Sequence, residues 1–105
     1  SGGKVRLGEC LIDFGAYTVT RGKSREHLSP MELELLRTLM NREGEAIDRN
    51  TLLELVWGRN AESTNRTVDT HVLKLRKKIE AQPDKPRHLL TVHGVGYRFS
   101  RRGEG

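Results

Sequence analysis

Apolar and polar residues alternate in short runs over residues 4–28, and glycines separate the runs. Val5 and Leu7, for example, flank Arg6. Alternation with a period of two is typical of strands that bury one face, and glycine favours the turns between them. The pattern therefore predicts an antiparallel meander of about four strands, each too short to be stable alone.

The apolar spacing becomes helical after Ser29. This serine can cap a helix, Pro30 suits the first helical position, and Glu32 completes a capping box with Ser29. The leucines that follow occupy a broad face, which indicates a largely buried helix. We expect this helix to end near Arg42.

A second, shorter helix is expected after Asp48, which is a good N-cap, and before Gly58. Its apolar residues include Trp57 near its end. The polar residues 59–63 that follow are typical of a loop.

The third predicted helix runs from about Thr64 to Glu80 and is followed by a segment with two prolines. At about 100° per residue, its apolar residues form one narrow stripe that is expected to face the core. These residues are Val68, Val72, Leu75 and Ile79. Residues 88–100 contain two strand-like runs around Gly94 and Gly96, which predicts a hairpin. The order of strands, three helices and hairpin indicates an α+β domain.

The side of the third helix opposite this stripe carries cations and hydroxyl groups, with no carboxylate among them. Its residues are Arg66, Thr67, Thr70, His71, Lys74, Lys77 and Lys78. Ordinary solvent-facing helices usually pair both signs of charge, so this face favours contact with phosphates and base edges in a DNA major groove. A chance run of surface cations is the alternative. Asp69 and Arg76 lie on the flank, and Leu73 either packs against a neighbouring element or contacts a thymine methyl group.

The predicted hairpin could supply a second contact. Its two glycines allow a tight turn and also a close approach of the backbone to a ligand. The basic residues around the turn are His93, Arg98, Arg101 and Arg102. A basic hairpin beside a basic helix could clamp a duplex across two grooves.

Charge supports the same interpretation. The 105 residues fit one compact domain with a net charge of +5. Residues 1–50 contain eight basic and eight acidic side chains, whereas residues 51–105 contain eleven and six. The whole excess of positive charge therefore lies in the half that holds the third helix and the hairpin, which favours a polyanion as partner. Solubility alone is the simpler explanation of this charge.

Other classes of function have little support in the sequence. Cys10 is the single cysteine, no apolar run is long enough to span a membrane, and the histidines show no metal-ligand spacing. Asp69 and His71 point to different sides of the helix and form no catalytic dyad, so we expect no enzyme, cofactor or metal. A protein-interaction module would show a more apolar or mixed-charge third helix, and RNA binding would require an aromatic stacking platform.

Four separated motifs resemble the DNA-binding output domain of OmpR/PhoB-type response regulators. They are LSPMELELL at residues 28–36, LLELVWG at 52–58, RTVDTHV with LRKKI between 66 and 79, and TVHGVGYRF at 91–99. They agree with the family in order and spacing, and the likeness covers residues 4–101. We therefore expect residues 4–101 to form the domain, residues 1–3 to be a linker or a cloning scar where a receiver domain was removed, and residues 102–105 to be a flexible tail.

The resemblance implies a winged helix-turn-helix with an N-terminal four-stranded antiparallel sheet, three helices and a C-terminal hairpin wing. It implies sequence-specific binding of double-stranded DNA by a bacterial, cytoplasmic transcription regulator, with the third helix in the major groove and the wing in the minor groove. It further implies tandem half-sites, a receiver domain in the full-length chain, a sensor histidine kinase acting on that receiver, and contact with an RNA polymerase subunit. The operator, the regulated genes and the direction of regulation stay open.

Transfer by position assigns roles to individual residues. The base-facing residues are Thr67, Asp69, Thr70, Leu73 and Lys74. The phosphate-contacting residues, taken together with the cationic face, are Trp57, Arg66, His71, Arg76, Lys77, Lys78, Thr91 and Tyr97. The wing residues are His93 at the tip and Arg98, and the polymerase-contact loop comprises Gly58, Arg59, Asn60, Ala61, Glu62 and Ser63. Two positions depart from the family: His93 replaces a frequent arginine with a shorter, pH-dependent contact, and Leu73 stands where some members carry a cation.

Overall fold

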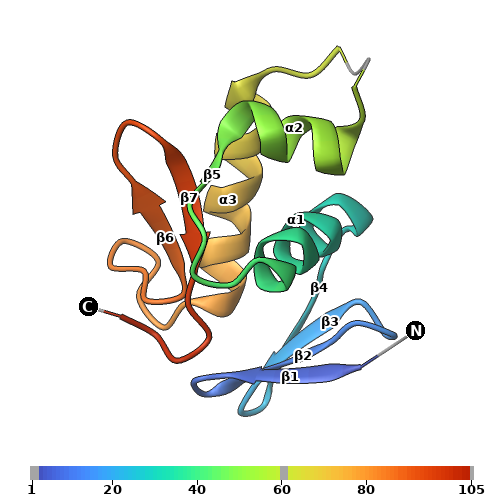
Figure 1. The fold of residues 1–105 in the computed structure, drawn as a ribbon. Helices are drawn as coiled ribbons and strands as arrows, with labels where there is room; N and C mark the ends of the chain where they lie inside the picture. The colour runs from blue at the N-terminus through green and yellow to red at the C-terminus, as the bar shows by residue number, and fades with distance from the viewer. Residues whose placement is uncertain (1–2, 60–61, 105) are drawn as a thin grey trace.

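The computed structural model describes residues 3–59 and 62–104 of the chain. Its N-terminal part is a four-stranded antiparallel sheet, in which the strands pair in the order of the chain (Figure 1). The strands are β1 (Lys4–Leu7), β2 (Cys10–Asp13), β3 (Thr18–Arg21) and β4 (Ser24–His27). In β2 the alternate residues Cys10 and Ile12 are fully buried, as the period-two pattern requires. The predicted meander is confirmed.

Three helices follow, and the first two begin directly after the predicted capping residues Ser29 and Asp48. They are α1 (Pro30–Asn41), α2 (Arg49–Trp57) and α3 (Asn65–Ile79). The Ser29 hydroxyl accepts the backbone N–H of Glu32 at 3.1 Å, and the Glu32 carboxylate accepts the backbone N–H of Ser29 at 2.8 Å. Asp48 likewise accepts the backbone N–H of Thr51 at 3.1 Å. Local hydrogen bonds thus fix where α1 and α2 begin.

The hairpin belongs to a second sheet that was only partly predicted. The sheet has the order β5-β7-β6, with β5 (Ile47–Asp48), β6 (Leu89–Val92) and β7 (Gly96–Phe99). The two residues of β5 pair with Tyr97 and Gly96 of β7 and so attach the hairpin to the residue that caps α2. A Cβ atom on Gly96 would lie 2.1 Å from the Ile47 carbonyl oxygen, which is far inside contact distance. The sequence suggested that the hairpin glycines allow a close approach of the backbone to a ligand. At Gly96 the group that approaches closely is instead β5 of the same chain.

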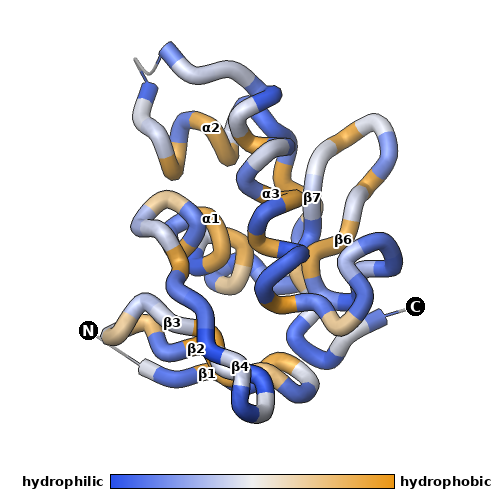
Figure 2. The backbone as a smooth tube through the Cα atoms, turned by 180° about the vertical axis from the view of Figure 1, so that it is seen from behind, coloured by the Kyte–Doolittle hydropathy of each residue, from blue (hydrophilic) through white to orange (hydrophobic). Residues whose placement is uncertain are grey.

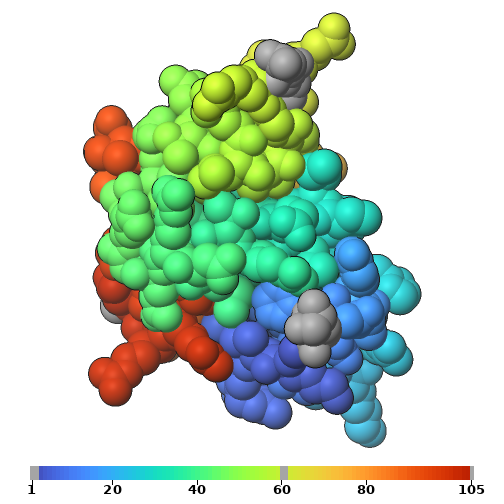
Figure 3. All heavy atoms as spheres, turned by 45° about the vertical axis from the view of Figure 1, so that its right-hand side comes forward, coloured from blue at the N-terminus to red at the C-terminus, as the bar shows by residue number. Residues whose placement is uncertain are grey.

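The core lies between the helices and both sheets. The four residues of the predicted apolar stripe of α3 are at most 1% exposed, and they give that helix its alternation of apolar and polar segments in Figure 2. In Figure 1, α3 runs between α1 on one side and the β6–β7 hairpin on the other. Figure 3 shows one face of the molecule, which is covered by α2 and α1 with the N-terminal sheet below them. This is the winged helix-turn-helix that the sequence predicts.

The C-terminal residues return to the hairpin. The backbone N–H of Glu104 donates to the Arg87 carbonyl at 2.8 Å, and that of Gly103 donates to the Ser100 hydroxyl at 3.2 Å. Within the described residues 102–104, the segment predicted as a flexible tail is therefore held by hydrogen bonds to the domain. None of the described helices combines the length and the apolar character that crossing a bilayer requires.

Candidate nucleic-acid interface

The outward face of α3 carries positive charge and no negative charge. Its exposed residues are Arg66, Thr70, Leu73, Lys74 and Lys77. Between the exposed residues and the core lie half-buried groups, including Thr67 and His71. The one carboxylate of the helix, Asp69, is on the flank. The geometry can therefore present three cations and a hydroxyl group to a polyanion.

The sequence left open whether Leu73 packs against a neighbouring element or is exposed to a ligand, and the structure decides between the two. Its side chain is 57% exposed, more than Leu55 or Val95. It is not packed against a neighbouring element, because it stands on the same exposed surface as Thr70, Lys74 and Lys77. A large apolar side chain in this position is available to an apolar group of a ligand.

Asp69 is engaged within the protein. The Tyr97 hydroxyl donates a hydrogen bond of 2.7 Å to one carboxylate oxygen, and the Arg49 guanidinium lies 3.6 Å from the other. Burial of the Tyr97 ring, together with this hydrogen bond, raises the pKa of Tyr97 to about 12. The phenol therefore stays protonated at neutral pH and keeps donating to Asp69. Asp69 can therefore contact a base only through the part of its carboxylate that Tyr97 and Arg49 do not engage.

Among the residues predicted to contact phosphates, Arg76 departs most from that predicted role. Its side chain is buried, with 9% of the residue exposed. The guanidinium donates twice to the Leu89 carbonyl, at 2.9 and 2.7 Å, and once to the Thr91 hydroxyl, at 2.9 Å. It also lies 5.7 Å from the centroid of the Tyr97 ring. The sequence missed this role because the partners lie 13 to 15 residues away along the chain.

Lys78 is a second cation with a partner inside the protein. Its ammonium group donates to the Glu32 carboxylate and to the His27 carbonyl, each at 2.8 Å. Burial acts to raise the pKa of Glu32, but the hydrogen bonds from Lys78 and Ser29 outweigh it and hold that pKa below its usual value. Lys78 therefore joins α3 to the start of α1, and its predicted contact with phosphate would have to compete with this pair.

Trp57 and His71 meet where α2 packs on α3. Their rings form an edge-to-face pair with centroids 4.9 Å apart. His71 Nδ1 lies 2.9 Å from the Thr67 carbonyl oxygen, one turn earlier in α3. Both side chains are half-buried, so each can present only an edge to a ligand.

The two faces of the hairpin differ. Thr91 and Tyr97 are paired across the strands, and both turn toward α3. Arg98, the next residue, turns to the other face, where Glu104 accepts two hydrogen bonds from its guanidinium at 2.6 and 2.8 Å. His93 at the tip is exposed. Of the two predicted wing contacts, His93 is accessible and Arg98 is paired on the face away from α3.

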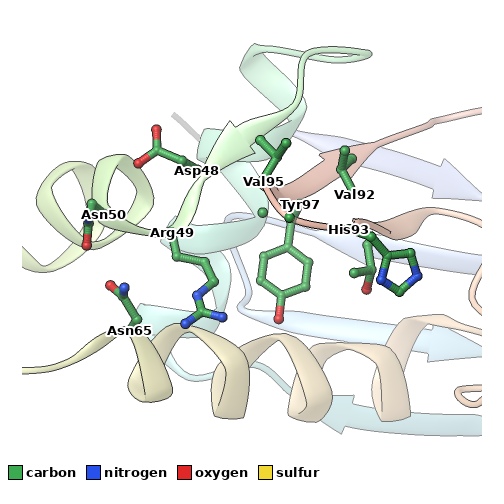
Figure 4. A pocket seen from close by; sticks show the side chains of 11 residues that line it. Asp48, Arg49, Asn50, Asn65, Val92, His93, Val95 and Tyr97 are labelled. Atoms are coloured by element: carbon green, nitrogen blue, oxygen red, sulfur yellow. The ribbon is translucent and has the colours of Figure 1, made fainter.

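A groove of about 460 Å³ separates the hairpin from the starts of α2 and α3. Figure 4 shows Arg49 and Asn65 reaching into it from the helix side, and Tyr97 and His93 bordering it from the hairpin. Arg49, Asn50 and Asn65 were missed in the sequence. They occupy the first positions of their helices. The pairing of β5 with β7 brings Arg49 and Asn50 next to the hairpin, and the attachment of α3 to the hairpin through Asp69 and Arg76 brings Asn65 there. Among the described residues, no group of three or more acidic, histidine or cysteine side chains is arranged to hold a metal ion.

Comparison with known proteins identifies the family. Residues 23–99 match the family described as "Transcriptional regulatory protein, C terminal". The chain belongs to this family. It is the family of winged-helix output domains of OmpR/PhoB-type response regulators, a class of transcription regulators rather than of enzymes.

Individual relatives agree with this output-domain assignment. The chain is 37% identical over 95 residues to the KDP operon transcriptional regulatory protein KdpE of Escherichia coli, an alignment that covers 90% of this chain and 42% of KdpE. Its fold is similar to that of the response regulator DrrB, a Thermotoga maritima OmpR/PhoB homologue, with a TM-score of 0.78, 37% identity, and coverage of 93% of this chain and 44% of DrrB. It is also similar to the Klebsiella pneumoniae RstA DNA-binding domain, solved in complex with the RstA box. That match has a TM-score of 0.74, 28% identity, and coverage of 94% and 98%. The chain thus spans less than half the length of KdpE.

The loop of residues 58–63, which the family resemblance predicts to contact RNA polymerase, is only partly described. Gly58 ends α2 in a left-handed conformation with φ 102°, and Arg59 after it is exposed. Glu62 is exposed and Ser63 is half-buried at the other end of the loop. Asn60 and Ala61 lie outside the described residues.

Proposed function

We propose that this output domain binds double-stranded DNA in a sequence-specific manner, with α3 in the major groove and the tip of the hairpin in the adjacent minor groove. The observation that carries the proposal is the composition of the exposed face of α3. That face presents three cations, one hydroxyl and one leucine and no carboxylate. A major groove admits an α-helix and offers phosphates at its edges and base edges at its floor.

Within this proposal, Lys74 and Thr70 read base edges, because they occupy the outward direction of the helix. The half-buried Thr67, whose hydroxyl accepts the backbone N–H of Thr64 at 3.4 Å, reads a base from the border of that face. Arg66 and Lys77 contact phosphates from either end of the same face. Asp69 contributes to base contact only through the part of its carboxylate that Tyr97 and Arg49 leave open.

Leu73 is proposed to read a thymine. The C5-methyl group of thymine is the apolar feature that a major groove presents to a side chain. An exposed leucine between Thr70 and Lys77 can bury that methyl group at no cost to the protein core.

The groove between the hairpin and the helix starts is proposed to hold one DNA backbone strand. Arg49 and Asn65 supply donors from the helix side, and Thr91 and Tyr97 lie at the other wall. Trp57 and His71 are proposed to contact the backbone on the opposite edge of α3. His93 enters the minor groove, whereas Arg98 and Lys78 are left out of the contact set because their charges are paired.

In the cell, we propose that the domain acts in the cytoplasm as the output part of a two-component transcription regulator. A receiver domain in the full-length chain, phosphorylated by a sensor histidine kinase, would control its binding to tandem half-sites. The loop of residues 58–63 would contact a subunit of RNA polymerase. Membership in the family supports this context, and so does the RstA domain, whose structure contains its DNA box.

The test is to select preferred duplexes from a random pool and to titrate one at several salt concentrations. The logarithm of the affinity should fall steeply with the logarithm of the salt concentration, by about 0.9 for each phosphate neutralised. A flat salt dependence, or no sequence enriched over the starting pool, would refute the proposal.

A further inference from the structure

Arg76 is the buried cation of α3, and its surroundings differ from those of an ion pair. Among the described residues, no carboxylate lies within 4.0 Å of its guanidinium, which instead donates to the Leu89 carbonyl and the Thr91 hydroxyl. Both acceptors belong to β6, the first strand of the hairpin. A guanidinium presents its N–H groups in a rigid planar fork, so two donors on one carbonyl fix the relative orientation of helix and strand.

The hairpin is held by α3 at a second point. Tyr97 of β7 lies under the Arg76 guanidinium and donates its hydroxyl hydrogen bond to Asp69. Asp69 and Arg76 are seven residues apart, so they lie on the same side of the helix, about 10 Å from each other along its axis. Two attachments at this separation determine both the distance and the angle between the hairpin and α3, which one attachment cannot do.

We propose that Arg76 is a positioning residue, which sets the hairpin at the angle to α3 that lets helix and wing enter adjacent grooves of one duplex. The consequence for DNA binding rests on the proposed function, whereas the orientation of the hairpin in the DNA-free protein does not. The competing role is the phosphate contact that the family resemblance implies. In that role the charge of Arg76 would act on the DNA directly, and the free protein would not depend on its hydrogen bonds.

The variant that separates the two roles is Arg76→Lys, because lysine keeps the charge and loses the planar fork. As a positioning residue, Arg76 cannot be replaced by lysine. In the DNA-free variant, backbone ¹⁵N order parameters of β6 and β7 should fall from about 0.85, typical of rigid backbone, to below about 0.6. The amides of β1–β4 should keep their order, which distinguishes a loosened hairpin from a general loss of structure.

The matched control is Lys77→Met, which removes the neighbouring exposed cation. This variant should leave the hairpin as rigid as in the original protein and should lower the salt slope of DNA binding by about 0.9. If Arg76→Lys leaves the hairpin amides unchanged, the positioning role is refuted, whether or not the domain binds DNA. Should Arg76→Lys fail to fold, the Arg76 side chain of the original protein decides: in the DNA-free domain its Nε–H order parameter should be close to the value of about 0.85 found for rigid backbone, and a value below about 0.6 refutes the proposal.

A DNA readout then tests the consequence. Hydroxyl-radical footprints on a selected duplex should show that Arg76→Lys keeps the protection around α3, loses the protection of the adjacent minor groove, and binds about tenfold more weakly. Equal loss of protection in both grooves would contradict a role confined to the angle of the wing. Absence of any footprint with the original protein would refute the proposed function, while the relaxation experiment would still decide the role of Arg76.

Discussion

The outward face of α3 and the two flanks of the same helix carry similar residues in very different surroundings. On the outward face, Arg66, Lys74 and Lys77 are exposed. On the flanks, Arg76 is bound to the hairpin and Lys78 to the Glu32 carboxylate. Five cations of one helix therefore divide into three that face solvent and two that hold the domain together.

A count of basic residues therefore overstates the charge available to a ligand. Each phosphate neutralised by a cation contributes about 0.9 to the salt slope of DNA binding. With Lys74 at a base edge, α3 should account for about two such contacts, from Arg66 and Lys77, rather than five. The paired cations act earlier, in folding, because they join α3 to α1 and to the hairpin. Variants of neighbouring residues can test this division directly.

The largest effect is expected from Lys78→Met. Removing the ammonium group leaves the buried Glu32 carboxylate without its cation, so the free energy of unfolding should fall by about 2–4 kcal/mol. Chemical denaturation measures this loss. Lys77→Met is the matched control on the outward face and should change stability by less than about 0.5 kcal/mol. If Lys78→Met instead lowers the salt slope of DNA binding and leaves the free energy of unfolding unchanged, Lys78 belongs with the exposed cations.

Acid unfolding tests the Lys78–Glu32 pair in a second way. Since the pKa of Glu32 is lowered in the folded protein, its contribution to stability is present above the ordinary value of 4.5 and is lost as the pH falls through the lowered pKa. In Lys78→Met much of this lowering disappears. Unfolding measured between pH 6 and about pH 3 should therefore show a shallower acid loss for the variant than for the original protein, whereas Lys77→Met should follow the original curve.

A smaller effect, on specificity, is expected from Lys74→Ala. If Lys74 reads a base edge, binding to a selected duplex should weaken by about 1–3 kcal/mol, while binding to unrelated duplexes weakens less. Competition titrations with both duplexes measure the difference. Lys77→Ala is the control, since a phosphate contact should affect both duplexes alike. Equal losses for Lys74→Ala would remove this residue from the base-reading set.

The smallest effect tests Leu73. Replacing the contacted thymine by uracil removes one methyl group, and its loss from a buried contact should cost about 0.8 kcal/mol, or roughly a fourfold change in affinity. In Leu73→Ala the same replacement should have no effect, because the apolar partner is gone. A scan of uracil substitutions across the selected duplex measures both. If no thymine responds, or if the response persists in Leu73→Ala, the proposed contact is wrong.

The parts of the fold that depend on neighbours in the sequence could be predicted. Ser29 and Asp48 were identified as caps because a capping side chain bonds to the backbone three residues on. The buried stripe of α3 followed from helical periodicity alone, as did the outward position of Lys74. The number of strands in the meander followed in the same way from alternation and glycines.

The parts that depend on residues distant in the sequence could not be predicted. The partners of Lys78 lie 46 and 51 residues away, and β5 is a strand only because two residues pair with β7. The position of Arg49 beside the hairpin follows from that pairing. The periodicity of α3 placed Arg76 correctly on the flank, but its acceptors became visible only with the hairpin in position.

The approach of β5 to Gly96 also determines which part of the hairpin is open to change. At Gly96 there is no room for any side chain, because the Ile47 carbonyl occupies the place of a Cβ atom. Gly94 at the tip has a φ of 78°, which other residues rarely adopt. Its neighbours His93 and Val95 are exposed, so these two can be exchanged while the base of the hairpin stays fixed. Engineered variants with new minor-groove preferences can therefore be sought in libraries confined to these tip residues.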